Sequence, residues 1–112
     1  MHMKQYVIDE IRATEHEKIR RYLDDTYGEA SLDGLYWIPL VDYLLNDVQH
    51  AHTECHPFFF ALELQPERLC CELLIRTRQR MRCDCIGYAN PAQRNWIVDV
   101  IDAMFEKLGL KT

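Results

Sequence analysis

Residues 58–75 decide the fold of this chain, and they read FFFALELQPERLCCELLI. Large apolar side chains alternate with smaller or charged ones on both sides of Pro66, which is the period of a strand with one buried face. The short connection at Pro66 and Glu67 predicts a tight hairpin. In the expected register core positions meet core positions, with Leu64 facing Leu69, Leu62 facing Cys71, Phe60 facing Leu73 and Phe58 facing Ile75.

A third strand is expected after this hairpin. A second turn near residues 78–80 returns the chain over 81–89. The expected pairs are Cys83 with Ile75 and Cys85 with Leu73. Both thiols then lie on the apolar face, where cysteine acts as a small hydrophobic residue. The opposite face carries charges of both signs, as in a half-solvated sheet, from Glu63, Glu72, Arg76, Arg82 and Asp84.

The N-terminal segment predicts a strand followed by a helix. Residues 5–10 alternate as a short strand does. Thr14 and Glu17 have the spacing of a capping box, so a helix is expected over 15–27. Gly28 supplies its end.

A second strand and a short helix are expected next. Residues 35–38 are aromatic and β-branched, and Pro39 ends this strand because it has no N–H to donate to a ladder. We expect the strand to run parallel to the first, through a right-handed crossover. Apolar residues at helical spacing predict a short helix over 40–49.

The C-terminal helix has the clearest signals. Asn90 is the expected N-cap, with Pro91 in the first turn and Gln93 completing a capping box, and Gly109 ends the helix. Its apolar stripe comprises Trp96, Ile97, Val100, Ile101, Met104, Phe105 and Leu108. The sequence therefore predicts a single domain, 1–112, of the α+β class. It has two layers, the order β-α-β-α-β-β-β-α, a mixed or antiparallel sheet of about five strands, and the long helix packed on one face.

Length, composition and charge limit the function. The chain has 112 residues, 48% of them hydrophobic, which suits one globular core. A net charge of −5 predicts no general binding of nucleic acid or of an anionic membrane. No apolar run approaches the ~20 residues of a membrane span, and no apolar signal segment opens the chain, so we expect a cytoplasmic protein.

One segment is dense in metal-ligand residues, because seven residues contain His50, His52, Cys55 and His56. If the preceding helix continues, the last three fall on one face, as a donor set suited to zinc. The fourth ligand is then His50, or Cys83 or Cys85 if those thiols turn away from the core. The alternative is a solvated helix end, where the dipole alone favours histidine.

The cysteines are expected to be reduced. There are five of them in a chain without a secretory signal, so at least one has no partner. No C-x-x-C stands at a helix start, so thioredoxin-like chemistry is not expected.

Four arginines surround the expected second turn, namely Arg76, Arg78, Arg80 and Arg82. Guanidinium groups at this density can bind a phosphate or the carboxylates of a partner. The alternative is that Glu63, Glu72 and Asp84 neutralise them, and that a charged tip only keeps the strand ends in solution.

No catalytic motif is present. The chain has no G-x-S-x-G, Gly-rich phosphate loop, dinucleotide fingerprint or H-E-x-x-H, and the neighbours Cys55 and His56 seldom act as nucleophile and base. We therefore expect a non-enzymatic domain without a cofactor that binds a protein partner or forms a homodimer, because sheet edges are left to cover. The alternative is a zinc-binding protein that uses residues 50–56.

Overall fold

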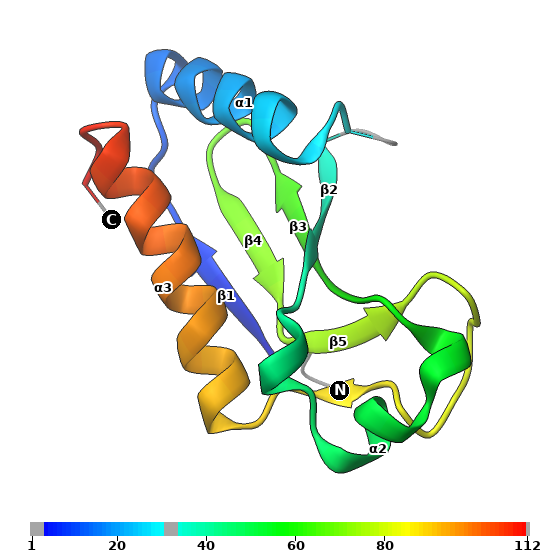
Figure 1. The fold of residues 1–112 in the computed structure, drawn as a ribbon. Coiled ribbons are helices and arrows are strands. Elements are labelled where there is room, and N and C mark those ends of the chain that lie inside the picture. The colour runs from blue at the N-terminus through cyan, green and yellow to red at the C-terminus, as the bar shows by residue number, and fades with distance from the viewer. Residues whose placement is uncertain (1–3, 31–33, 112) are drawn as a thin grey trace.

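The alternation in residues 58–75 forms the middle of an antiparallel sheet (Figure 1). The computed structural model describes residues 4–30 and 34–111. In chain order its elements are β1 (Gln5–Ile8), α1 (Ala13–Tyr27), β2 (Leu35–Pro39), η1 (Asp42–Leu44), α2 (Asp47–Ala51), η2 (Thr53–Cys55), β3 (Phe58–Leu64), β4 (Leu69–Glu72), β5 (Leu74–Thr77), β6 (Gly87–Tyr88) and α3 (Pro91–Lys107). The α+β class is confirmed, with six strands where about five were expected.

Strand β3 is paired along both edges. It pairs with β2 on one side and with β4 and β5 on the other, while β1 pairs with β4 and β6 with β5. Every one of these pairs is antiparallel, so β2 runs opposite to β1, and the expected parallel crossover is wrong. The reason is that β2 finds its apolar partners on β3, where Tyr36 lies opposite Leu62 and Ile38 opposite Phe60.

The predicted hairpin register holds for its first half only. Leu64 pairs with Leu69 and Leu62 with Cys71, as expected. Phe58 instead pairs with Thr77, so the expected pairs of Phe58 with Ile75 and Phe60 with Leu73 are wrong.

A bulge at Leu73 causes this difference. Its N–H donates to the Lys4 carbonyl at 3.0 Å, and its carbonyl accepts from the Ala89 N–H at 2.8 Å, so its backbone bonds to the strands on the outer side. The β4–β5 side of the ladder gains two residues relative to β3. Because side chains alternate between the faces with a period of two, every side chain stays on its expected face. Ile75 accordingly stays fully buried.

The third strand is much shorter than predicted. Only Gly87 and Tyr88 join β5, with Gly87 opposite Ile75, and residues 78–86 form a loop. Cys83 and Cys85 therefore do not face Ile75 and Leu73 in a ladder. Residues 83–86 close a turn of their own, in which the Ile86 N–H donates to the Cys83 carbonyl at 3.0 Å.

The N-cap of helix α1 lies two residues before the expected one. Arg12 is the N-cap, and its N–H donates to the Glu15 carboxylate at 2.9 Å, so the capping box at Thr14 and Glu17 is wrong. Glu17 pairs with Arg20 instead. The helix ends before Gly28, as expected.

The helix expected over 40–49 is divided into η1 and α2. Asn46 starts α2 by accepting from the Gln49 N–H at 2.8 Å, and Gln49 accepts from the Asn46 N–H at 3.1 Å. This second capping box turns Gln49 into the core, where it is 1% exposed, and leaves Val48 45% exposed. The apolar spacing was therefore misleading here.

Both long helices pack on one face of the sheet (Figure 1). Asn90, Pro91 and Gln93 start α3 as predicted. Trp96 of α3 stacks on Phe60 with ring centroids 6.1 Å apart. Lys107 of α3 lies over the Tyr22 ring of α1, which places the helices side by side. No helix in residues 4–30 and 34–111 is long and apolar enough to cross a membrane.

Each of these helices is joined to a strand by a tyrosine–aspartate hydrogen bond. The Tyr6 hydroxyl donates to Asp102 of α3 at 2.6 Å, and the Tyr36 hydroxyl donates to Asp24 of α1 at 2.6 Å. Burial and then the bonded aspartate raise the pKa of both tyrosines to about 12. The neutral hydroxyl is the form that bonds to the carboxylate, so the folded state favours it.

Replacing Tyr6 by Phe should lower the free energy of unfolding by about 1–2 kcal/mol, because a hydrogen bond to a charged acceptor is lost. Since the folded pKa of Tyr6 is raised from 10.0 to about 12, its contribution is complete below pH 10 and is lost as the pH rises toward 12. Urea titrations at neutral and alkaline pH measure both effects. The control is Tyr43→Phe, at a side chain 81% exposed. Equal losses in the two variants would refute this account.

Candidate metal centre

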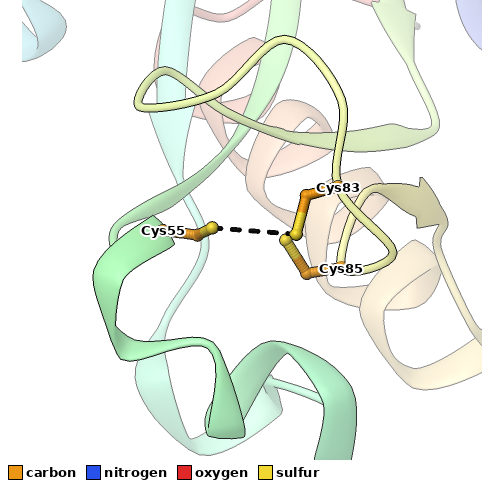
Figure 2. A group of neighbouring side chains, drawn as sticks. All are labelled: Cys55, Cys83 and Cys85. Carbon is orange, nitrogen blue, oxygen red and sulfur yellow. Dashed lines mark hydrogen bonds between the residues drawn. The ribbon is translucent and has the colours of Figure 1, made fainter.

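Three cysteines from two separate segments meet beside the sheet. Cys55 ends η2, and Cys83 and Cys85 lie in the loop between β5 and β6. Figure 2 shows their sulfur atoms pointing toward one another. All three sulfurs lie within 4.8 Å of one another, and those of Cys55 and Cys83 are 3.9 Å apart.

These distances suit a shared tetrahedral metal ion. With a Zn–S bond of about 2.3 Å, two sulfurs on one tetrahedron are about 3.8 Å apart. The 3.9 Å between Cys55 and Cys83 is close to that edge. A disulfide needs about 2.05 Å, and all five cysteines are free thiols, as the sequence led us to expect.

A buried amide pair holds the segment that carries Cys55. Gln93 of α3 donates from Nε2 to the Gln49 side chain at 2.9 Å and to the Leu44 carbonyl at 2.8 Å. Gln49 also belongs to the capping box of α2, and Gln93 to that of α3. Each side chain therefore helps to cap its own helix, and the bond between them joins α2 to α3. The turn of η2 follows, and in it the Cys55 N–H donates to the His52 carbonyl at 3.0 Å.

Thr77 connects the two halves of the site. Its buried hydroxyl donates to the Cys55 carbonyl. The same oxygen accepts from the Gln79 N–H at 3.1 Å, at the beginning of the 78–86 loop. The loop that carries Cys83 and Cys85 therefore leaves the sheet directly beside Cys55.

The three thiols differ in acidity. Burial raises the pKa of Cys55, and burial followed by hydrogen bonding with its two neighbours raises the pKa of Cys85 to about 12. Hydrogen bonds from the backbone and then the side chain of Cys85 lower the pKa of Cys83, and the charge of His52 acts in the same direction. Cys83, which is half-buried, is the thiol most ready to become a thiolate.

The histidines predicted as ligands lie apart from this cluster. His50 is exposed at the end of α2. The His52 ring donates from Nδ1 to the Val48 carbonyl at 2.6 Å, and the His56 ring donates from Nε2 to the Gln49 carbonyl at 2.8 Å. Because α2 ends at Ala51 and a 3-10 turn follows, the helix face expected for His52, Cys55 and His56 does not form.

Sequence reasoning found part of this cluster. Of the four residues proposed in 50–56, only Cys55 joins it, while Cys83 and Cys85, considered as alternative fourth ligands, both do. The C-x-C spacing of the latter two favours strand alternation, but both residues lie in the loop between β5 and β6. The signal for the alternative lay in the neighbouring residues, since 78–80 are three polar residues in a row before Met81, which no buried strand favours.

The four arginines are placed differently from one another. Arg76 bonds to Glu72 at 2.6 and 3.2 Å. The Arg78 guanidinium lies over Trp37, 5.2 Å from the ring centroid. Arg80 and Arg82 are exposed in the loop.

Comparisons with protein-family models, with curated proteins and with solved structures find no match to this chain. The chemistry assigned to the site therefore rests on its own residues.

In metal-free protein Cys83 should be the first cysteine of the cluster to react with iodoacetamide. It is half-buried and its pKa is lowered, whereas Cys55 and Cys85 are buried and their pKa values are raised. Its reaction should therefore begin at lower pH. Peptide mass mapping over pH 6–9 gives the order, and Cys83→Ser should remove the fast phase. Faster labelling of Cys55 or Cys85 would contradict the assignment.

Proposed function

We propose that the chain is a zinc-binding domain in which Cys55, Cys83 and Cys85 hold a structural zinc ion. The observation that carries this proposal is the convergence of three sulfurs within 4.8 Å from two segments of the chain. Core packing alone does not require three thiols at one point, whereas three cysteines and one further ligand are an ordinary donor set for structural zinc.

The donor type selects the metal. Thiolates are soft ligands that favour zinc among the common divalent ions, while calcium and magnesium take oxygen ligands. Within the described part of the chain, the group that converges contains no carboxylate. Zinc also suits reduced cysteines, because Zn²⁺ is redox-inactive and does not oxidise the thiolates that bind it.

His52 is the fourth ligand in this proposal, and metal binding would have to bring its ring closer, because the ring lies outside the group of three converging sulfurs. The Val48 carbonyl can only accept, so the His52 Nδ1 carries the proton and Nε2 keeps its lone pair. A carbonyl bonded to the second ring nitrogen is the usual support of a zinc-bound histidine.

A site closed by four side chains has a structural role. Catalytic zinc keeps one position for water, whereas structural zinc is enclosed by protein ligands. Here the ion would join η2 to the 78–86 loop. This agrees with a chain that contains no catalytic motif.

Protein purified without a His tag should contain about one zinc ion per chain, and chelation should lower its melting temperature by about 10 °C or more. Replacing Cys55, Cys83 or Cys85 by Ser should remove most of the metal. The control is Cys70→Ser, at a buried cysteine on β4 outside the cluster. Elemental analysis and thermal melts measure both effects. A metal content equal in all four variants, or none in the parent protein, would refute the proposal.

His52→Ala should lower zinc affinity by about 10–100-fold, because a water molecule replaces the imidazole. In the cobalt-substituted protein the thiolate-to-metal absorption should remain while the ligand-field bands change. His50→Ala and His56→Ala are the matched controls and should leave these bands unaltered. Loss of affinity in a control variant but not in His52→Ala would assign the fourth position to another histidine.

A further inference from the structure

The sheet face opposite the helices carries a cluster of aromatic and basic side chains. Trp37 of β2 and Phe59 of β3 are diagonal neighbours on this face, because Trp37 pairs with Ala61 and Phe59 with Pro39. Their ring centroids lie 6.0 Å apart in an edge contact. Both are half-buried. Both long helices pack on the other face, against Phe60 and Tyr36, so they do not cover these rings.

Arg78 completes this cluster. Its guanidinium lies 5.2 Å from the centroid of Trp37 and 6.0 Å from that of Phe59, in a cation–π arrangement. A hollow of about 350 Å³ opens beside it, lined among others by Trp37, Arg76, Arg78 and Arg80. A second hollow of about 360 Å³ shares Trp37 and Arg78. We name Trp37, Phe59, Arg78 and Arg80 the Trp37 surface.

The Trp37 surface has a charge opposite to that of the whole chain. The chain carries −5. Arg76 is neutralised by Glu72. In residues 4–30 and 34–111, no carboxylate lies within 4.0 Å of Arg78 or Arg80, so two guanidinium groups keep their donors for a ligand.

We propose that the Trp37 surface binds an acidic segment of a partner protein. An apolar side chain of that segment would contact Trp37 and Phe59, and its carboxylates would bond to Arg78 and Arg80. Tryptophan and arginine together are the residues that most often dominate protein interfaces. Arginine also binds carboxylates with two parallel hydrogen bonds.

A protein segment fits this surface better than a nucleic acid strand. A strand of phosphates needs a continuous basic track and several open aromatic faces. Here there are two aromatic rings, and Arg78 already covers one face of Trp37. Glu72 occupies Arg76, which would otherwise extend the track.

The metal site connects to this surface through the loop. Arg78 and Arg80 belong to the same 78–86 loop as Cys83 and Cys85, and Thr77 bonds to Cys55 at its beginning. A zinc ion on these cysteines would hold the arginines in place, so removal of zinc should weaken binding. This coupling rests on the proposed function, whereas the binding surface itself does not.

The experiment uses the full chain as purified and a short fluorescein-labelled peptide in which Asp and Glu alternate with Leu and Phe. Fluorescence anisotropy should show binding that Arg78→Gln and Arg80→Gln each weaken about tenfold. Arg21→Gln is the matched control, because Arg21 pairs with Glu17 on the exposed side of α1. Since Arg80 is exposed, its variant tests the surface even if Arg78→Gln lowers stability.

Competing occupants give different results. Equal binding of a peptide with Lys in place of Asp and Glu would overturn the proposal, as would tighter binding of a single-stranded oligonucleotide. A dimer in solution that Arg80→Gln dissociates would overturn it in favour of a second copy of the chain. Chelation should weaken peptide binding. If the protein contains zinc and chelation changes nothing, the coupling is wrong. If it contains none and the acidic peptide still binds, the metal proposal fails and the surface stands.

Discussion

Strand β3 determines the sheet because it is paired along both edges while only one of its faces is buried. Phe58, Phe60 and Leu62 point into the core, whereas Glu63 is exposed. A slip of one residue would bring Glu63 into the core, so odd shifts in register are excluded. A shift of two keeps every side chain on its face, and this is the shift that occurs at Leu73. The core tolerates that bulge because a shift of two residues in the register returns the same side chains to the buried face.

The bulge in turn decides where Cys55, Cys83 and Cys85 lie. It places Thr77 opposite Phe58, the first residue of β3. Phe58 follows Cys55 by only three residues, so Thr77 lies near Cys55. The Thr77 hydroxyl can therefore reach the Cys55 carbonyl, and the chain leaves the sheet over η2. In the register without a bulge the third strand would have continued beside β5, with Cys83 against Ile75. A local rearrangement of the ladder thus brings two distant cysteine segments together.

The sequence was a sound guide to elements with redundant signals and a poor one to loops. Periodicity, turn and cap signals agreed for β3, for its hairpin with β4 and for α3, and these were predicted correctly, whereas the strand expected to continue from β4 is interrupted before β5. The prediction of a helix over 40–49 was wrong because its apolar spacing conflicted with a second Asn-x-x-Gln capping box. That box, from Asn46 to Gln49, determines where α2 begins. The site was found only in part, since Cys55 and the C-x-C pair were both considered but their meeting depends on a bulge. No local pattern marks that bulge, because Leu73 is as good a strand residue as its neighbours.

The position of the cluster also explains why a metal would stabilise this loop better than further apolar residues. Residues 78–82 are all exposed, with Met81 96% exposed, so the loop buries little apolar surface before Cys85. Fixing such a loop costs conformational entropy. Between Thr77, where β5 ends, and Gly87, where β6 begins, no hydrogen bonds between paired strands offset this cost. In the proposed site, three thiolates and a zinc ion would supply the missing enthalpy at one point, so the arginines nearby could stay exposed. Burying them in a larger core would have removed the basic surface that the loop presents.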